Sequence, residues 1–122
     1  MAAIDMISVP SPVLGVTQAQ TLTITPAQAQ ARCIVHNFGA SGGSTVYLPS
    51  AMPGMRVDVI CAAAQIITLT PVAGEYMIVP STGVAKPVSL ALASSASAAN
   101  KVSLICTSRG IWNAATYLGT WA

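Results

Sequence analysis

The stretch TVYLPSAMPGMRVDVICAAAQIITLTPVAGEYMIV, residues 45–79, alternates apolar and polar residues in short runs that are separated by breaks containing proline and glycine. Pro49 and Pro71 each close such a run, and the segments AMPG and VAGE follow shortly after them. Proline cannot donate a ladder hydrogen bond, and glycine takes the backbone conformations that tight turns need. The stretch therefore predicts strand, turn, strand, turn.

The same alternation continues on both sides of this stretch. A helical period would place charged residues such as Arg56 and Asp58 in the core, whereas a period of two places them outside. The sequence therefore predicts an all-β fold, a single antiparallel β-sandwich, jelly roll or small barrel of about seven to nine short strands. The positions predicted to face the core are Cys33, Val35, Val46, Leu48, Val57, Val59, Cys61, Ile67, Leu69, Val88, Leu90, Leu92, Val102, Leu104 and Cys106.

Residues 1–30 differ in composition from the rest of the chain. They contain three prolines and the Gln/Ala tracts TQAQ and PAQAQ, and TLTIT is their only strand-like run. We therefore predict an extended N-terminal arm over residues 1–30 and a β-sandwich domain over residues 31–122. A helical turn from Pro26 to Gln30 is an alternative for the end of the arm, because Ala and Gln favour helix and proline suits its first position.

The chain carries few charges, which limits the partners it can have. Charged residues make up 7% of the sequence and the hydrophobic class 53%, so we expect contacts between subunits. The formal net charge of +2 comes from dispersed basic residues, and dispersed cations give little counterion-release drive for binding nucleic acid. No apolar run approaches the ~20 residues of a membrane-spanning helix. Neither nucleic acid nor membrane is an expected partner.

Three groups of residues could carry chemistry, and each has a simpler explanation. Ser41 lies in GASGG, which matches G-x-S-x-G, but a strand follows it and His36, the single histidine, precedes it. Cys33 and His36 have metal-pair spacing, yet three positions along a strand place them on opposite faces. Cys33, Cys61 and Cys106 are expected to be buried, reduced thiols. We therefore predict no enzyme, no cofactor and no metal site.

The carboxylates and aromatic residues lead to the same conclusion. Asp5, Asp58 and Glu75 are scattered, and Asp58 is expected to be a cross-strand partner of Arg56 or a neighbouring basic residue. Trp112, Tyr117 and Trp121 could form a sugar-stacking platform, although Trp112 and Trp121 are on opposite faces of a strand that does not bend at Gly119. We favour Trp112 capping the core, with Tyr117 and Trp121 at a subunit contact.

Three segments carry a resemblance. VYLPSAMPGMRVDVI, IITLTPVAGEYMI and VSLALASSASAANKVSLICTSRGIWNA resemble small virion proteins of tailed bacteriophages, in which V-x-L-P-x-A-x-x-G enters a strand, I-x-x-x-P-x-x-G follows and G-x-W ends the pattern. The resemblance covers residues 45–115. It implies a structural protein of the virion that is made in the bacterial host cytoplasm.

Among the roles that the resemblance implies, the low charge favours a capsid decoration (cement) protein. Such a protein binds the major capsid protein on the outside of the assembled head, as a homotrimer, and stabilises contacts between capsomers. Contacts with the shell are expected at Ile4, Met6, Ile7, Val9 and Leu14, and contacts within the trimer at Tyr117, Leu118 and Trp121. The alternative is a head-fibre or tail-fibre module that binds host polysaccharide, which predicts a coiled-coil or β-helical shaft. A hydrolase using Ser41 is the third possibility.

Overall fold

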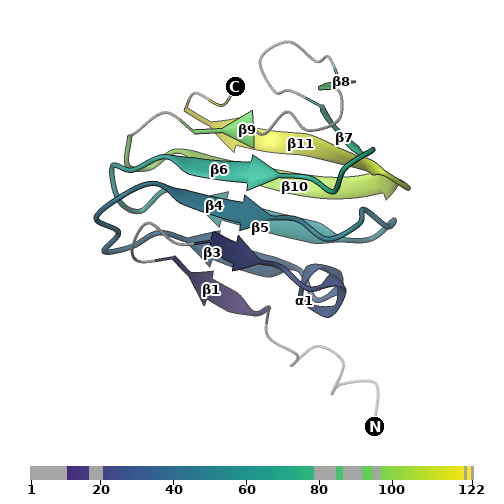
Figure 1. Cartoon of the computed structure of the whole chain (residues 1–122), viewed down its shortest axis with the longest axis horizontal. Coiled ribbons are helices and arrows are strands. Elements are labelled where there is room, and N and C mark those ends of the chain that lie inside the picture. Colours follow the sequence, from purple (N-terminus) through teal and green to yellow (C-terminus); the bar gives the residue numbers. More distant parts are fainter. Residues whose placement is uncertain are drawn as a thin grey trace, which may run out of the picture.

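The computed structural model describes residues 11–16, 21–78, 85–86, 92–94, 97–119 and 121. Within these residues the chain forms short strands and a single helix, α1 (Pro26–Gln30) (Figure 1). The strands are β1 (Val13–Gly15), β2 (Thr21–Thr23), β3 (Cys33–His36), β4 (Ser44–Tyr47), β5 (Arg56–Ile60), β6 (Ile67–Thr70), β7 (Tyr76–Ile78), β8 (Ala85–Lys86), β9 (Leu92–Ala93), β10 (Lys101–Ser108) and β11 (Ile111–Leu118). The all-β class is confirmed.

The strands form two sheets. Sheet A has seven strands in the order β1-β3-β5-β10-β11-β7-β8, and sheet B has four in the order β2-β4-β6-β9. Five strand pairs are parallel: β1 with β3, β3 with β5, β7 with β11, β2 with β4, and β4 with β6. The prediction of an antiparallel sandwich or jelly roll is therefore wrong in strand direction, and neither sheet closes into a barrel.

The parallel pairs arise because successive strands alternate between the sheets. β1, β3 and β5 lie in sheet A, and β2, β4 and β6 follow them in turn in sheet B. Val13 pairs with Ile34, and Cys33 with Val57, so the chain returns to the same sheet after roughly 20–25 residues, a spacing typical of solenoids. These six strands form three coils of a two-sheet parallel β-solenoid, which we call the coil stack.

The C-terminal part of the chain continues sheet A in a different way. β10 pairs antiparallel with β5 of the last coil, β11 completes a hairpin with β10, and β9 runs antiparallel to β6. Figure 1 shows this antiparallel part at the opposite end of the molecule from β1. The coil stack thus ends in an antiparallel hairpin instead of a fourth coil.

Between the sheets lies one hydrophobic core, and the predicted alternation holds wherever the structure describes it. All predicted core residues from Cys33 to Leu69 are buried, as are Val102, Leu104 and Cys106. Val88 and Leu90 lie outside the described residues, and of Leu92 only the backbone is described. Gly54 and Gly74 have φ values of 96° and 92°, which supports the turns predicted at AMPG and VAGE.

The predicted N-terminal arm is corrected for residues 13–16 and 21–30. β1 and β2 are strands of sheets A and B, and Val16, Ile24 and Ala29 are buried in the core. The boundary at residue 30 is misplaced because VLG is too short to show a period of two, and the strand-like run TLTIT lies between two Gln/Ala tracts. Residues 1–10 lie outside the described residues.

The alternative helical turn at the end of this segment is confirmed. Helix α1 begins after Thr25, whose side chain accepts a hydrogen bond from the Gln28 backbone N–H, while the Gln28 side chain accepts one from the Thr25 N–H. This reciprocal capping box, with Pro26 at the first helical position, satisfies backbone donors that a helix start leaves open. With five residues, this helix is far too short to cross a membrane, and no other described helix could do so.

Candidate functional site

The outer face of sheet A carries aligned rows of side chains, which follow from the strand register. One row runs across five strands through Val13, Ile34, Asp58, Ser103 and Thr116. The neighbouring row runs through Gly15, His36, Ile60, Lys101 and Leu118. These positions alternate with the buried core residues, so their side chains point away from sheet B.

Asp58 is the centre of a polar cluster on this face. Its Oδ1 atom accepts a hydrogen bond from Ser103 Oγ at 2.5 Å and lies 3.2 Å from the Arg56 Nε atom. Both partners of the Asp58 carboxylate belong to sheet A: Arg56 lies on the same strand and Ser103 on the neighbouring one. Asp58 pairs with Arg56, as predicted, but the two residues belong to the same strand and do not pair across strands.

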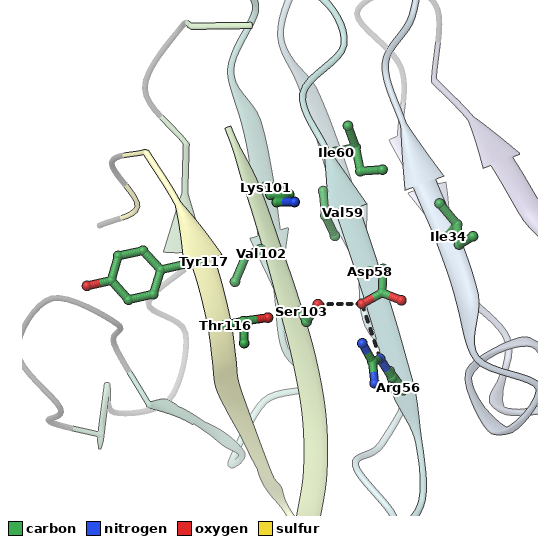
Figure 2. Close-up of a pocket in the computed structure, with 10 residues that line it drawn as sticks. All are labelled: Ile34, Arg56, Asp58, Val59, Ile60, Lys101, Val102, Ser103, Thr116 and Tyr117. Carbon is green, nitrogen blue, oxygen red and sulfur yellow. Dashed lines mark hydrogen bonds and ion pairs between the residues drawn. The ribbon is translucent and has the colours of Figure 1, made fainter. Parts of the chain in front are cut away.

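A groove of about 520 Å³ opens over this cluster. Ile34, Ile60 and Thr116 contribute to its walls together with the two basic residues Arg56 and Lys101. Figure 2 shows Asp58 and Ser103 joined across the groove, with Ile34 on one side and Thr116 on the other. The groove therefore combines a carboxylate that already has two partners with cationic and apolar groups.

Exposed apolar side chains surround the groove. Val13, Ile60 and Leu118 are 62%, 40% and 53% exposed, and all three belong to the two outer rows. Sheet B is different: its outer rows, Thr21–Thr45–Thr68 and Thr23–Tyr47–Thr70, are mostly threonine, and its strands contain no charged residue. Apolar surface and charge thus occur together on sheet A, which makes its outer face the candidate binding face.

The predicted contact residues have different positions in the structure. Tyr117 and Leu118 are exposed, and Tyr117 contributes to the groove, although its ring points away from Asp58 and Lys101 (Figure 2). Leu14 is half-buried and packs against the core. The remaining predicted shell contacts, Ile4, Met6, Ile7 and Val9, lie outside the described residues.

Trp121 corrects the prediction of a subunit contact at that residue. Its side chain is only 2% exposed, and its Nε1–H donates to the backbone oxygens of Lys101 and Leu118. Strand β11 ends at Leu118, and Gly119, with φ 85°, turns the chain so that Trp121 folds into the core. Trp112 is also fully buried, as predicted. Neither tryptophan can stack on a ligand.

The groups considered for catalysis and metal binding do not assemble in the described part of the chain. Ser41 lies in the loop between β3 and β4, and His36 Nδ1 accepts a hydrogen bond from the Phe38 backbone N–H. Cys33 is buried while His36 is half-buried on the other face of the strand. Among the described residues, no group of three or more His, Cys, Asp and Glu side chains could hold a metal ion.

The three cysteines are free and buried, as predicted. Burial raises the pKa of the Cys33 thiol from 9.0 to about 11, and the nearby Asp58 charge acts in the same direction. Burial also raises the pKa of the Cys61 and Cys106 thiols. The structure thus stabilises the neutral form of each thiol.

This shift predicts a loss of stability at alkaline pH. Because the Cys33 pKa is higher in the folded chain, its contribution is complete below pH 9 and is lost as pH rises towards about 11. A two-unit shift corresponds to about 2–3 kcal/mol of unfolding free energy. Urea unfolding of the wild type and Cys33→Ala at pH 8 and pH 10.5 measures it, and we expect a smaller decrease in the variant. Equal decreases in both proteins would contradict this assignment.

The groove was not predicted from the sequence. Asp58 and Arg56 stand out there as a possible ion pair, whereas Lys101, Ser103 and Ile34 lie in other segments. The available signal was that Lys101 and Ser103 occupy outward positions of the alternating run KVSLICT. Their alignment with Asp58 depends on the pairing of β5 with β10, which separates the partners by more than 40 positions in the sequence.

Comparison with known proteins found no matching family model, no similar curated protein and no similar solved structure.

Proposed function

We propose that this chain is a capsid decoration protein of a tailed bacteriophage. In this proposal it binds the major capsid protein on the outside of the assembled head and stabilises contacts between capsomers by binding alone. It is made in the cytoplasm of the bacterial host and acts on the virion exterior, without a cofactor. The resemblance of residues 45–115 to small virion proteins supports the class of protein, and the outer face of sheet A supports the mode of action.

The observation that carries the proposal is the exposed apolar surface around the groove. Val13, Ile60 and Leu118 present apolar area on a face whose strands are held in place by a buried core. Covering apolar area contributes about 25 cal/mol per Å², so a face of this kind gives modest affinity for each copy. Repeated around a symmetric shell, modest contacts add up through avidity. Weak binding by each copy is therefore sufficient for a decoration protein.

Self-association is part of the proposal. Tyr117 and Leu118 are exposed at the end of β11, and Leu118 continues the outer row of Ile60 and Lys101. Tyr117 and Leu118 remain the proposed trimer contacts, and Trp121 is no longer one of them.

A fibre module that binds host polysaccharide is the second candidate, and the coil stack is the observation that favours it. Stacked parallel coils are the architecture of a β-helical shaft, and the described strands β1 to β6 form three of them. The burial of Trp112 and Trp121 weighs against the polysaccharide part of this candidate, because sugar stacking uses exposed aromatic rings. We therefore retain the decoration role as the proposal.

The copy number of the chain relative to the major capsid protein in purified particles tests the proposal. Quantitative mass spectrometry is expected to give a ratio near one or a fixed large fraction of one. A few copies per particle would assign the chain to a fibre or tail module. Absence from the particles would overturn the virion assignment.

Substitutions on the two faces test which one binds the shell. Ile60→Lys adds a charge to the outer face of sheet A, and we expect it to weaken co-sedimentation with undecorated shells by roughly tenfold or more. Tyr47→Lys is the matched control, since Tyr47 is similarly exposed, at 43%, on the outer face of sheet B. A larger loss of binding for Tyr47→Lys than for Ile60→Lys would show that sheet B is the binding face.

A further inference from the structure

The groove on sheet A has an excess of positive charge. Arg56 and Lys101 face a single carboxylate, Asp58, whose Oδ1 atom already accepts from Ser103 Oγ and the Arg56 Nε atom. The Arg56–Asp58 contact is the only ion pair found in the described part of the chain, so the Lys101 ammonium group is not paired with any described carboxylate. The groove can therefore accept one further negative charge near Lys101.

The surroundings of Lys101 define what should carry that charge. Lys101 pairs in register with Ile60 on one side and Leu118 on the other, and Ile34 lies on the opposite wall of the groove. Apolar neighbours on both sides favour an acidic side chain with apolar residues next to it. The Tyr117 ring points away from Asp58 and Lys101, so it gives a sugar carboxylate no stacking surface inside the groove (Figure 2).

The chain itself contains one carboxylate that fits this description. Of its three acidic residues, Asp58 belongs to the groove, and Glu75 accepts hydrogen bonds from the Ala51 N–H at 2.8 Å and Ser50 Oγ at 2.6 Å. The third is Asp5, in the segment Ile4-Asp5-Met6-Ile7, where apolar residues stand on both sides of it. This segment therefore matches the groove in both charge and apolar character.

We propose that residues 4–7 of one copy bind the groove of a second copy, with the Asp5 carboxylate against Lys101. Five residues lie between Asp5 and Ser11, where the described chain begins, and the six residue-to-residue steps can span up to about 20 Å. That reach is enough to extend beyond the edge strand β1 to a neighbouring molecule. Each copy supplies one segment and one groove, so a closed ring such as a trimer satisfies every copy. The inference deepens the self-association proposed above and does not require a shell. It assigns Ile4, Met6 and Ile7 to a contact between copies in place of the shell contacts expected from the sequence.

Charge reversal tests the contact with the full-length protein. Size-exclusion chromatography with light scattering is expected to show an oligomer that dissociates on dilution. Lys101→Glu and Asp5→Lys should each weaken association roughly tenfold or more, and the double variant Asp5→Lys/Lys101→Glu should restore it to within a few fold. Arg109→Glu, an equal charge change in the exposed β10–β11 turn, is the control. A monomeric wild type, or a double variant as weak as the single ones, would overturn the proposal.

Cross-linking identifies the two partners directly and does not depend on variants. Carbodiimide joins a carboxylate and an amine that are already in contact. Applied to a mixture of ¹⁴N-labelled and ¹⁵N-labelled copies, it is expected to give Asp5–Lys101 peptides that combine both labels. Cross-linked peptides that never combine both labels would place the segment in its own groove and overturn the exchange between copies, as would the absence of the cross-link. The decoration role is tested separately by the copy number on particles. Absence of the Asp5–Lys101 cross-link would therefore overturn only the contact between copies.

Discussion

Replacing Asn37 with alanine is expected to lower the free energy of unfolding by about 2–4 kcal/mol. Asn37 is fully buried in the turn after β3, and its Oδ1 atom accepts hydrogen bonds from the Ala62 and Ala63 N–H groups at 2.7 and 2.9 Å. Its Nδ2 group donates to the backbone oxygens of Ala63 and Gln65. The alanine variant would leave these part-buried backbone groups without their side-chain partner.

Asn37 has this large expected effect on stability because it joins two coils of the coil stack. Asn37 follows a strand of the second coil, and its partners lie in the loop between β5 and β6 of the third coil. One side chain therefore ties the turns of two adjacent coils together. Asn113→Ala is the control, because the Asn113 amide makes an exposed hydrogen bond with Thr107 Oγ1, and its loss should cost about 1 kcal/mol or less. Urea unfolding measures both variants, and equal losses would contradict this role for Asn37.

Replacing Gly119 with alanine is expected to cost about 2–5 kcal/mol and to displace Trp121 from the core. Gly119 has φ 85°, and a Cβ atom at this position would overlap the side-chain amide of Asn100, which is buried. Relief of that overlap requires either that the Asn100 side chain leave its buried position or that the chain take a different path after β11. Trp121 depends on the present path, since its backbone bridges Ser94 and its indole N–H donates to Lys101.

Gly74→Ala separates the cost of a positive φ from the cost of the overlap with Asn100. Gly74 has φ 92°, but a Cβ atom there would meet no atom within 4 Å, so only the backbone strain of about 1–2 kcal/mol applies. We expect a red shift of tryptophan emission for Gly119→Ala and none for Gly74→Ala. If both variants lose the same stability and keep the wild-type emission spectrum, the contact with Asn100 does not position Trp121.

The sequence contains a weak repeat that indicates the coil stack. The runs TLTITP, TVYLP and TLTP each end in a proline, at Pro26, Pro49 and Pro71, and each overlaps a strand of sheet B. Thr21, Thr45 and Thr68 are consequently aligned on one face. The repeat is weak because the loops differ in length and composition, so it predicts equivalent strands only when the three runs are compared with each other.

What the sequence by itself determined is which side of each strand faces the core. This property is local, because successive side chains of a strand alternate and a single misplaced charge in the core is costly. Runs such as RVDVI and KVSLICT therefore predicted their buried residues correctly. The capped turn at Pro26 is local in the same sense, since Thr25 and Gln28 satisfy each other within four residues.

Only the tertiary structure decided which strands become neighbours and in which direction. A period of two is the same for parallel and antiparallel pairing, so the alternation between sheets A and B could not be inferred from any single run. The groove depends on that pairing, because Asp58 meets Ser103 only where β5 lies beside β10. The direction of Trp121 likewise follows from the turn at Gly119 and the space available between the sheets, a property of the packed core as a whole.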